Sequence, residues 1–230
     1  MNSSTKLTTT KKTAVCIFAH PDDEAFGPAG TIHKLTKKYD VYLLCATKGE
    51  IGKNSSNRKK NLIEVRADEL RKSAKILGIK KVYFLGFVDG TLSNSLYHKL
   101  ASSIEKHLKS LKPEIILTSN PNGGSGHIDH IVVSMVSSYL FERLAFVKKI
   151  MYTAMLREAT DKWKKQEYFV YRPDGIKRSE VDEIVDVSDV WDTKIAAMKA
   201  HASQKHDYER IIEMRKDLPK EEYFIVRKRD

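Results

Sequence analysis

Short apolar runs alternate along the chain with longer stretches of helical periodicity. The apolar runs predict buried strands at Thr13–Ala19, Val41–Ala46, Lys81–Phe84, Glu114–Thr118 and Lys149–Ala154. The stretches between them predict helices over Phe26–Tyr39, Arg58–Leu77, Ser95–Leu111 and His127–Phe146. Because alternating strands and helices form βαβ units, we expect an α/β protein with a Rossmann-like, doubly wound and mainly parallel sheet that has helices on both faces.

The last third of the chain is less regular. A polar and aromatic segment, Thr160–Arg178, precedes a predicted strand at Glu183–Val187 and a predicted helix at Val190–Gln204. A charged helical stretch and a closing strand at Tyr223–Arg227 follow. No linker, repeat or low-complexity block divides the chain. We therefore expect a flexible N-terminus over residues 1–12 and a single domain over residues 13–230.

The composition excludes several classes of protein. Of 230 residues, 41% are hydrophobic and 31% are charged, which excludes a disordered or collagen-like chain. No apolar run approaches the length of about 18 residues that spans a membrane, and no signal peptide is recognisable. These features favour a cytoplasmic protein without membrane association. Cys16 and Cys45 lie inside apolar runs, which predicts buried free thiols.

The chain carries a net charge of +11, from 41 basic and 30 acidic residues. Such an excess favours anionic partners, including nucleic acid, phosphorylated substrates and membrane surfaces. The lysines are scattered over the predicted helices, however, and no basic–aromatic recognition motif accompanies them. A solvated surface that binds no nucleic acid is the simpler interpretation, and a basic nucleic-acid-binding protein is the alternative.

Candidate chemistry follows the first predicted strand, at Ala19-His20-Pro21-Asp22-Asp23-Glu24. Sites in doubly wound sheets form at the carboxyl ends of the strands. Carboxylates this close raise one another's pKa unless a cation neutralises them. A divalent metal bound by His20 and one carboxylate would resolve the conflict and would leave a second carboxylate free to act as a base.

A second cluster, His127-Ile128-Asp129-His130, follows the fourth predicted strand and a glycine-rich loop. If the strand order is 3-2-1-4-5, the first and fourth strands are neighbours, and His20 lies beside this cluster. Two histidines and a carboxylate with an open position are typical of a catalytic zinc site. The plainer alternatives are that Asp22 is a helix N-cap and that His127 or His130 is a polar helix start.

With these motifs the sequence resembles a known family, the PIG-L/LmbE-like zinc-dependent N-acetylglucosaminyl deacetylases. The resemblance rests first on the six residues Ala19–Glu24 and runs roughly from residue 14 to 226. Further motifs that look like those of the family are Thr47–Gly52, Arg66–Glu69, Leu85–Gly90, Asp186–Ser188 and His201–Gln204.

The resemblance implies a role for each matching residue. It makes His20, Asp23 and His130 the zinc ligands and Asp22 the general base. His127 would polarise the carbonyl and stabilise the oxyanion, and Asp129 would orient or charge a histidine. Arg66 falls where the family places an arginine near the substrate. His201 and Gln204 match a recurrent motif, and whether they touch the site is open.

The implied reaction removes an N-acetyl group from an acetamido sugar or sugar conjugate and releases acetate and a free amine. Another metal-dependent amidase or esterase on the same scaffold is the alternative, and the ligand set would also hold Fe²⁺ or Co²⁺. Members of the family are often homo-oligomers. Two departures are Ser125, where mycothiol-pathway members have a tyrosine, and Ile128, where a proline is usual. Substrate choice is expected to depend on rim residues 53–58 and 155–180.

Overall fold

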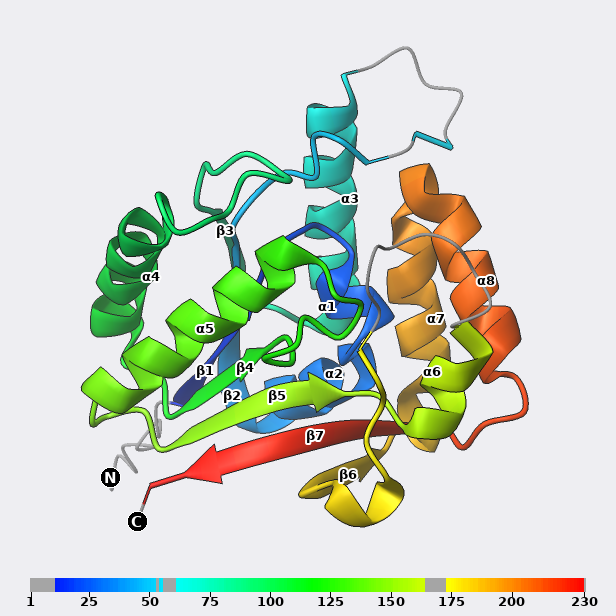
Figure 1. The fold of residues 1–230 in the computed structure, drawn as a ribbon. Helices are drawn as coiled ribbons and strands as arrows, with labels where there is room; N and C mark the ends of the chain where they lie inside the picture. Colours follow the sequence, from blue (N-terminus) through cyan, green and yellow to red (C-terminus); the bar gives the residue numbers. More distant parts are fainter. Residues whose placement is uncertain (1–10, 53, 56–60, 164–172, 230) are drawn as a thin grey trace, which may run out of the picture.

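A seven-stranded sheet forms the centre of the molecule, as the computed structural model of residues 11–52, 54–55, 61–163 and 173–229 shows (Figure 1). Its strand order is β3-β2-β1-β4-β5-β7-β6. The first five strands are parallel: β1 (Lys12–Phe18), β2 (Tyr39–Cys45), β3 (Lys81–Phe84), β4 (Ile115–Thr118) and β5 (Lys149–Ala154). The predicted Rossmann-like arrangement and the adjacency of the first and fourth strands are confirmed.

Helices cover both faces of the sheet, and the side chains of β1 explain why. Ala14, Cys16 and Phe18 point into one core, while Val15 and Ile17 point into the other, so the strand is apolar from Ala14 to Phe18. Three helices that pack on the first core are α2 (Ala29–Lys38), α3 (Leu62–Leu77) and α7 (Trp191–Ala200). Two helices, α4 (Tyr97–Leu111) and α5 (Ile128–Arg143), cover the second core. Cys16 and Cys45 are buried free thiols, as predicted.

The predicted elements differ from the structure mainly at their ends. The expected helix at Phe26–Tyr39 is divided by Gly27 and Pro28 into a single turn, α1 (Asp23–Phe26), and α2. Within the expected irregular segment, α6 (Arg157–Trp163) is helical. Of the expected flexible terminus, residues 1–10 lie outside the described residues, and Lys12 already belongs to β1, where it is paired with Tyr39. Residues 58–60 of the second expected helix, Arg58–Leu77, also lie outside them.

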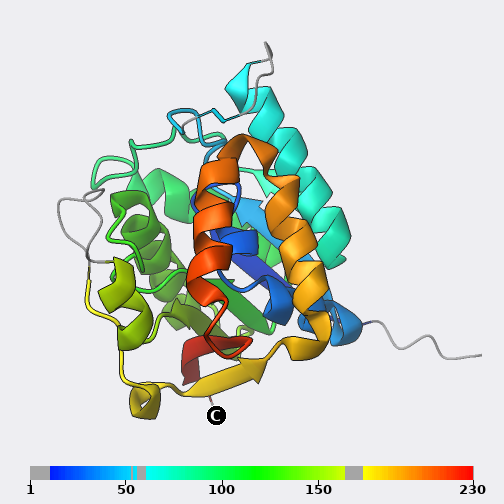
Figure 2. The same ribbon diagram turned by 90° about the vertical axis from the view of Figure 1, so that its right-hand side faces the viewer.

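The C-terminal third closes one edge of the sheet. β7 (Glu221–Lys228) runs antiparallel to β5, and β6 (Glu183–Asp186) pairs with β7. The charged stretch forms α8 (Lys205–Arg215), which lies beside α6 at this edge (Figures 1 and 2). In the described part of the chain, none of the helices combines the length and apolar character that crossing a membrane requires.

A buried ion pair ties this C-terminal layer to the first core. Lys194 of α7 is fully buried, and its Nζ lies 2.6 Å from Glu222 Oε1 of β7. The Glu222 carboxylate also accepts the backbone N–H groups of Gly30 and Thr31, at 3.0 and 2.7 Å, in the first turn of α2. A carboxylate at the positive end of a helix is stabilised there. The pair therefore links α2, α7 and β7.

We expect Lys194→Met to destabilise the protein strongly. The substitution leaves the Glu222 charge buried without its cation, which typically costs about 3–5 kcal/mol. Urea denaturation followed by circular dichroism measures the change. Lys34→Met is the matched control, because Lys34 pairs with the exposed Asp189 at the surface and should shift the midpoint far less. Equal midpoints for the two variants would contradict the role assigned to the pair.

Candidate metal and catalytic centre

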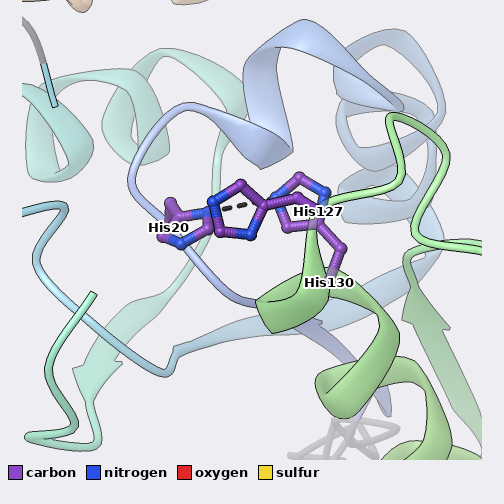
Figure 3. Close-up of side chains that lie close together, drawn as sticks. All are labelled: His20, His127 and His130. Atoms are coloured by element: carbon purple, nitrogen blue, oxygen red, sulfur yellow. Dashed lines mark hydrogen bonds between the residues drawn. The ribbon is translucent and has the colours of Figure 1, made fainter. Parts of the chain in front are cut away.

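The two sequence clusters meet at the carboxyl ends of β1 and β4. His20 follows β1 directly, and His130 lies in the first turn of α5. His20 Nδ1 and His130 Nε2 are 3.0 Å apart, although 110 residues separate them in sequence (Figure 3). Asp23 completes the group, since its Oδ1 is 3.2 Å from His130 Nε2 and its Oδ2 is 3.9 Å from His20 Nδ1. The three predicted ligands are therefore neighbours.

The outer nitrogen of each ring is held by a hydrogen-bond acceptor. His20 Nε2 lies 2.9 Å from Asp89 Oδ1 and 3.2 Å from Asp129 Oδ2, so it carries a proton. His130 Nδ1 lies 3.0 Å from the carbonyl oxygen of Gly123, so it also carries a proton. The two nitrogens that face each other are then both lone-pair nitrogens in the neutral rings. A proton or a metal cation has to lie between them, because two bare lone pairs repel.

The charges around His20 and Asp23 favour a cation at this point. Burial lowers the pKa of His20, but the hydrogen bonds to Asp129 and Asp89 and the charge of Asp23 outweigh it and raise the pKa to about 10. Burial would raise the pKa of Asp23, but the charge and hydrogen bond of His130 hold it well below its ordinary value. An ionised carboxylate and imidazoles of high proton affinity form a site that attracts positive charge.

The side chain of Asp22 does not act as a helix cap. It occupies the N-cap position of α1 with a left-handed backbone, φ 106°, yet its side chain caps no N–H. Its Oδ2 instead accepts a hydrogen bond from Arg66 Nη2 at 2.8 Å. Burial raises the pKa of Asp22 to about 6, while the charge of Arg66 lowers it. Left-handed backbone at a non-glycine residue is costly, and such strain is often found at functional sites.

Arg66, predicted to lie near the substrate, is only 4% exposed. Its Nη2 donates to Asp22 and, at 2.6 Å, to the carbonyl oxygen of Pro21, and its Nη1 donates to the carbonyl oxygen of Gly49 at 3.0 Å. These contacts show that Arg66 holds Asp22 and two backbone turns in place. Gly49 has φ 70°, and a Cβ there would lie 2.1 Å from the guanidinium, so only glycine fits beside it.

His127 has the plainer role that the sequence offered, that of a polar helix start, and its role at the oxyanion stays a prediction. It is the N-cap of α5, and its Nδ1 accepts the backbone N–H of Asp129 at 3.2 Å. Its Nε2 consequently carries the proton of the neutral ring. Burial and the neighbouring charges of His20 and His130 lower the pKa of His127, which favours that neutral form. The ring centroid lies 4.7 Å from that of His20 (Figure 3). His127 is therefore a neutral hydrogen-bond donor beside the three predicted ligands.

Asp129 and Asp89 fix His20 from behind. Asp129 is 1% exposed, and besides His20 its carboxylate accepts the N–H groups of Gly90 and Leu92, at 2.8 and 3.1 Å. This position agrees with the predicted task of orienting a histidine. The sequence reasoning missed Asp89 as a site residue. Asp89 lies directly before a glycine in the loop that follows β3, and this position was the available signal.

Two sets of side chains that lack Asp23 bring their ligand atoms within 4.8 Å of one another among the described residues. One is His20, His127 and His130, and the other is His20, Asp89 and Asp129. In the first set, His127 Nδ1 already accepts the capping hydrogen bond from the backbone N–H of Asp129. In the second set, both carboxylates face the protonated Nε2 of His20. The set with Asp23 is the one in which every donor atom can offer a lone pair.

His201 and Gln204 lie behind the site. His201 is fully buried, and its Nε2 is 2.8 Å from Glu24 Oε1. The other oxygen of Glu24 accepts the backbone N–H of Asp22 at 3.1 Å. Gln204 donates to Ser203, whose hydroxyl and N–H bind the carboxylate of Glu69. The His201 motif thus supports the backbone at Asp22 through Glu24.

Comparisons with known proteins show what the chain is similar to. The family model described as PIG-L, GlcNAc-PI de-N-acetylase, matches residues 15–140. A probable N-acetyl-alpha-D-glucosaminyl L-malate deacetylase 2 of Bacillus cereus is 30% identical, over 82% of this chain and 81% of that protein. Diacetylchitobiose deacetylase of Thermococcus kodakarensis is 30% identical, over 84% of this chain and 70% of that protein.

The fold is shared with solved structures. The N,N'-diacetylchitobiose deacetylase from Pyrococcus horikoshii superimposes with a TM-score of 0.67 over 94% of this chain and 84% of that one, at 24% sequence identity. Since that identity is low, the likeness supports the Rossmann-like fold alone.

Proposed function

Because the chain belongs to the PIG-L (GlcNAc-PI de-N-acetylase) family, we propose that it is a metal-dependent N-deacetylase. It hydrolyses the N-acetyl amide of an acetamido sugar or sugar conjugate to acetate and a free amine. The observation that carries the proposal is the pair of lone-pair nitrogens, His20 Nδ1 and His130 Nε2, 3.0 Å apart beside Asp23. Both relatives named above are deacetylases of N-acetylated sugars by name, which supports the substrate class.

The residues that would hold the metal are His20, Asp23 and His130. Zinc bonds of about 2.0–2.1 Å in tetrahedral geometry separate ligand atoms by roughly 3.3 Å. The two imidazole nitrogens are 3.0 Å apart, and Asp23 Oδ1 lies 3.2 Å from His130 Nε2, close to that value. The other oxygen of Asp23, Oδ2, lies 3.9 Å from His20 Nδ1. Two imidazoles and a carboxylate suit Zn²⁺, and Fe²⁺ or Co²⁺ would also fit. When bound, the ion supplies Lewis acidity to the amide carbonyl and to a water molecule.

Asp22 is proposed as the general base. With a pKa of about 6 it is ionised at neutral pH and can still be protonated during the reaction. Arg66 holds one carboxylate oxygen at 2.8 Å, which leaves the other oxygen to accept the proton of the attacking water. The left-handed backbone of Asp22 sets the direction of the side chain. The same carboxyl group can later return the proton to the leaving amine.

His127 is proposed to stabilise the oxyanion. The N–H of Asp129 occupies its Nδ1, so the protonated Nε2 is the nitrogen that can donate to the carbonyl oxygen. A donor whose position is fixed beforehand does not have to reorganise as negative charge develops, and such a donor is typically worth about 3–4 kcal/mol. The helix cap therefore sets the tautomer that the reaction needs.

Another amide or a small ester as substrate is the alternative, because the same groups would attack either carbonyl. Acetate release from a panel of N-acetyl sugars distinguishes these substrates. The cytoplasmic location, the lack of nucleic-acid binding, and a homo-oligomeric assembly stay predictions.

We expect His20→Ala, Asp23→Ala and His130→Ala each to lose bound metal, since each removes one of three protein ligands. His127→Ala is the matched control and should retain the metal, because its Nδ1 serves the helix cap. Elemental analysis of the purified variants measures the occupancy. Retention in Asp23→Ala together with loss in His127→Ala would replace this ligand set by the three histidines.

Asp22→Asn should keep the metal and lose about 10²–10⁴-fold in kcat, the usual contribution of a general base. Asparagine tolerates left-handed backbone, so the turn at Asp22 is preserved. Steady-state acetate release measures the loss, with the exposed Asp189→Asn as control. Turnover within a few-fold of the parent would assign the base to another residue.

Arg66→Met should move the acid limb of the kcat/KM profile to higher pH. The positive charge of Arg66 lowers the pKa of Asp22, so its removal raises that pKa, and the base becomes protonated at higher pH. Arg71→Met, on the exposed face of the same helix, controls for the loss of a surface charge. An unchanged acid limb in Arg66→Met would show that Asp22 is not the titrating base.

A further inference from the structure

A cavity of about 430 Å³ opens directly beside Asp23 and His130. Away from these two residues its walls are mainly apolar. They come from α1, from the segment that joins β5 to α6, and from α8, of which α6 and α8 are seen side by side in Figure 2. The apolar lining residues that matter here are Phe26, Met155, Leu156, Ile211, Met214 and Leu218. The cavity is thus continuous with the proposed metal centre.

The cations in its wall are already engaged within the protein. Arg178 forms an ion pair with Glu221, with nitrogen–oxygen distances of 2.5 and 3.0 Å. Arg215 donates to the carbonyl oxygen of Glu221 at 2.6 Å, and its guanidinium lies 5.6 Å from the ring centre of Trp191. Glu221 neutralises Arg178, and Arg215 is held by a carbonyl oxygen and an aromatic ring, while Glu158, a further acid in the lining, is exposed. The mainly apolar wall therefore favours an apolar occupant.

Polar groups lie at the part of the centre that the cavity does not reach. Asp22, Asp89 and Arg66 do not line the cavity and lie close to the loops that follow β2 and β3. Sugar hydroxyl groups need hydrogen-bond partners and are costly to bury against carbon. The amide nitrogen and the acyl chain leave the carbonyl carbon in different directions. A sugar on the polar side consequently directs the acyl chain into the apolar cavity.

The size of the cavity exceeds what an acetyl group needs. A volume of about 430 Å³ lies in the range of pockets that enclose a whole small ligand. The methyl of an acetyl group would leave most of the apolar wall exposed to water, whereas a longer chain would cover it. Burial of that surface is the main source of binding free energy in such a pocket.

We propose that the substrates include N-acyl amino sugars whose acyl chain is longer than acetyl, with the chain in this cavity. The inference rests on the proposed amide hydrolysis and extends its acyl group. Water supplies the oxygen of the new C–O bond to the acyl carbon, the C–N bond breaks, and the nitrogen takes the proton. The products are a medium-chain carboxylate and the free amino sugar.

The test is the dependence of kcat/KM on chain length for N-acetyl-, N-butyryl-, N-hexanoyl- and N-octanoylglucosamine. Each buried methylene should raise kcat/KM by about fourfold at most, so we expect a gain of about tenfold or more from acetyl to hexanoyl. The octyl and methyl glycosides of N-acetylglucosamine, compared in parallel, should differ little. A higher kcat/KM for the octyl glycoside without any gain in the acyl series would overturn the proposal. A kcat/KM that falls as the acyl chain lengthens would overturn it as well.

Variants locate the effect. Met214→Glu places a charge in the cavity wall and should flatten the chain-length series. Met135→Glu makes the same change at an exposed methionine of α5 and should keep the series of the parent. A flattened series in both variants, or in neither, would contradict the assignment to this cavity.

Calorimetry provides a readout that does not depend on turnover. Octanoate should bind the parent and Met135→Glu more tightly than acetate does, with a negative heat-capacity change, and this preference should vanish in Met214→Glu. If octanoate binds but no amide is hydrolysed, both the proposed function and the N-acyl substrate are wrong. If N-acetylglucosamine is hydrolysed without a chain-length gain, the N-acyl substrate alone is wrong.

Discussion

The facing nitrogens of His20 and His130 are the constraint on which the rest of the site depends. Each ring is fixed by a partner at its far nitrogen: the carboxylates of Asp89 and Asp129 for His20, and the carbonyl oxygen of Gly123 for His130. Those partners determine the tautomers and direct two lone pairs toward one point. Because two bare lone pairs 3.0 Å apart repel, the pair needs a proton or a metal cation between the two nitrogens. Asp23, held by the backbone N–H groups of Ala19 and His20, supplies the negative charge beside that point.

The sheet brings these groups together because β1 and β4 are parallel neighbours whose carboxyl ends lie at one edge. Around the proposed metal position, the contacts of three groups differ. Asp22, the proposed base, has left-handed backbone and is held by Arg66, while His127, the proposed oxyanion donor, has its tautomer set by the cap of α5. The motif containing His201 supports the backbone from behind, through Glu24. Buried polar groups that are satisfied in this way rigidify a site.

Sequence reasoning reached the strand order and the meeting of His20 with His130, because apolar periodicity and motif position both survive in the folded chain. Its placement of Arg66 near the substrate stays a prediction, and it did not foresee the bonds of Arg66 to Asp22 and the backbone. Asp89 was missed because a single acid after a short strand carries no periodic signal. The pairing of Lys194 with Glu222 and the apolar cavity depend on how α6, α7, α8 and β7 pack. No local pattern encodes such packing between elements distant in sequence.

The central claim is that the lone-pair geometry of His20 and His130 exists to bind a catalytic cation. A chelator titration tests it most directly, with bound metal and acetate release from an acetamido sugar measured on the same samples of the unaltered protein. We predict about one equivalent of a divalent transition metal per chain, and activity that falls in proportion to the metal removed and returns when zinc is restored. Full activity in metal-depleted samples would contradict the account.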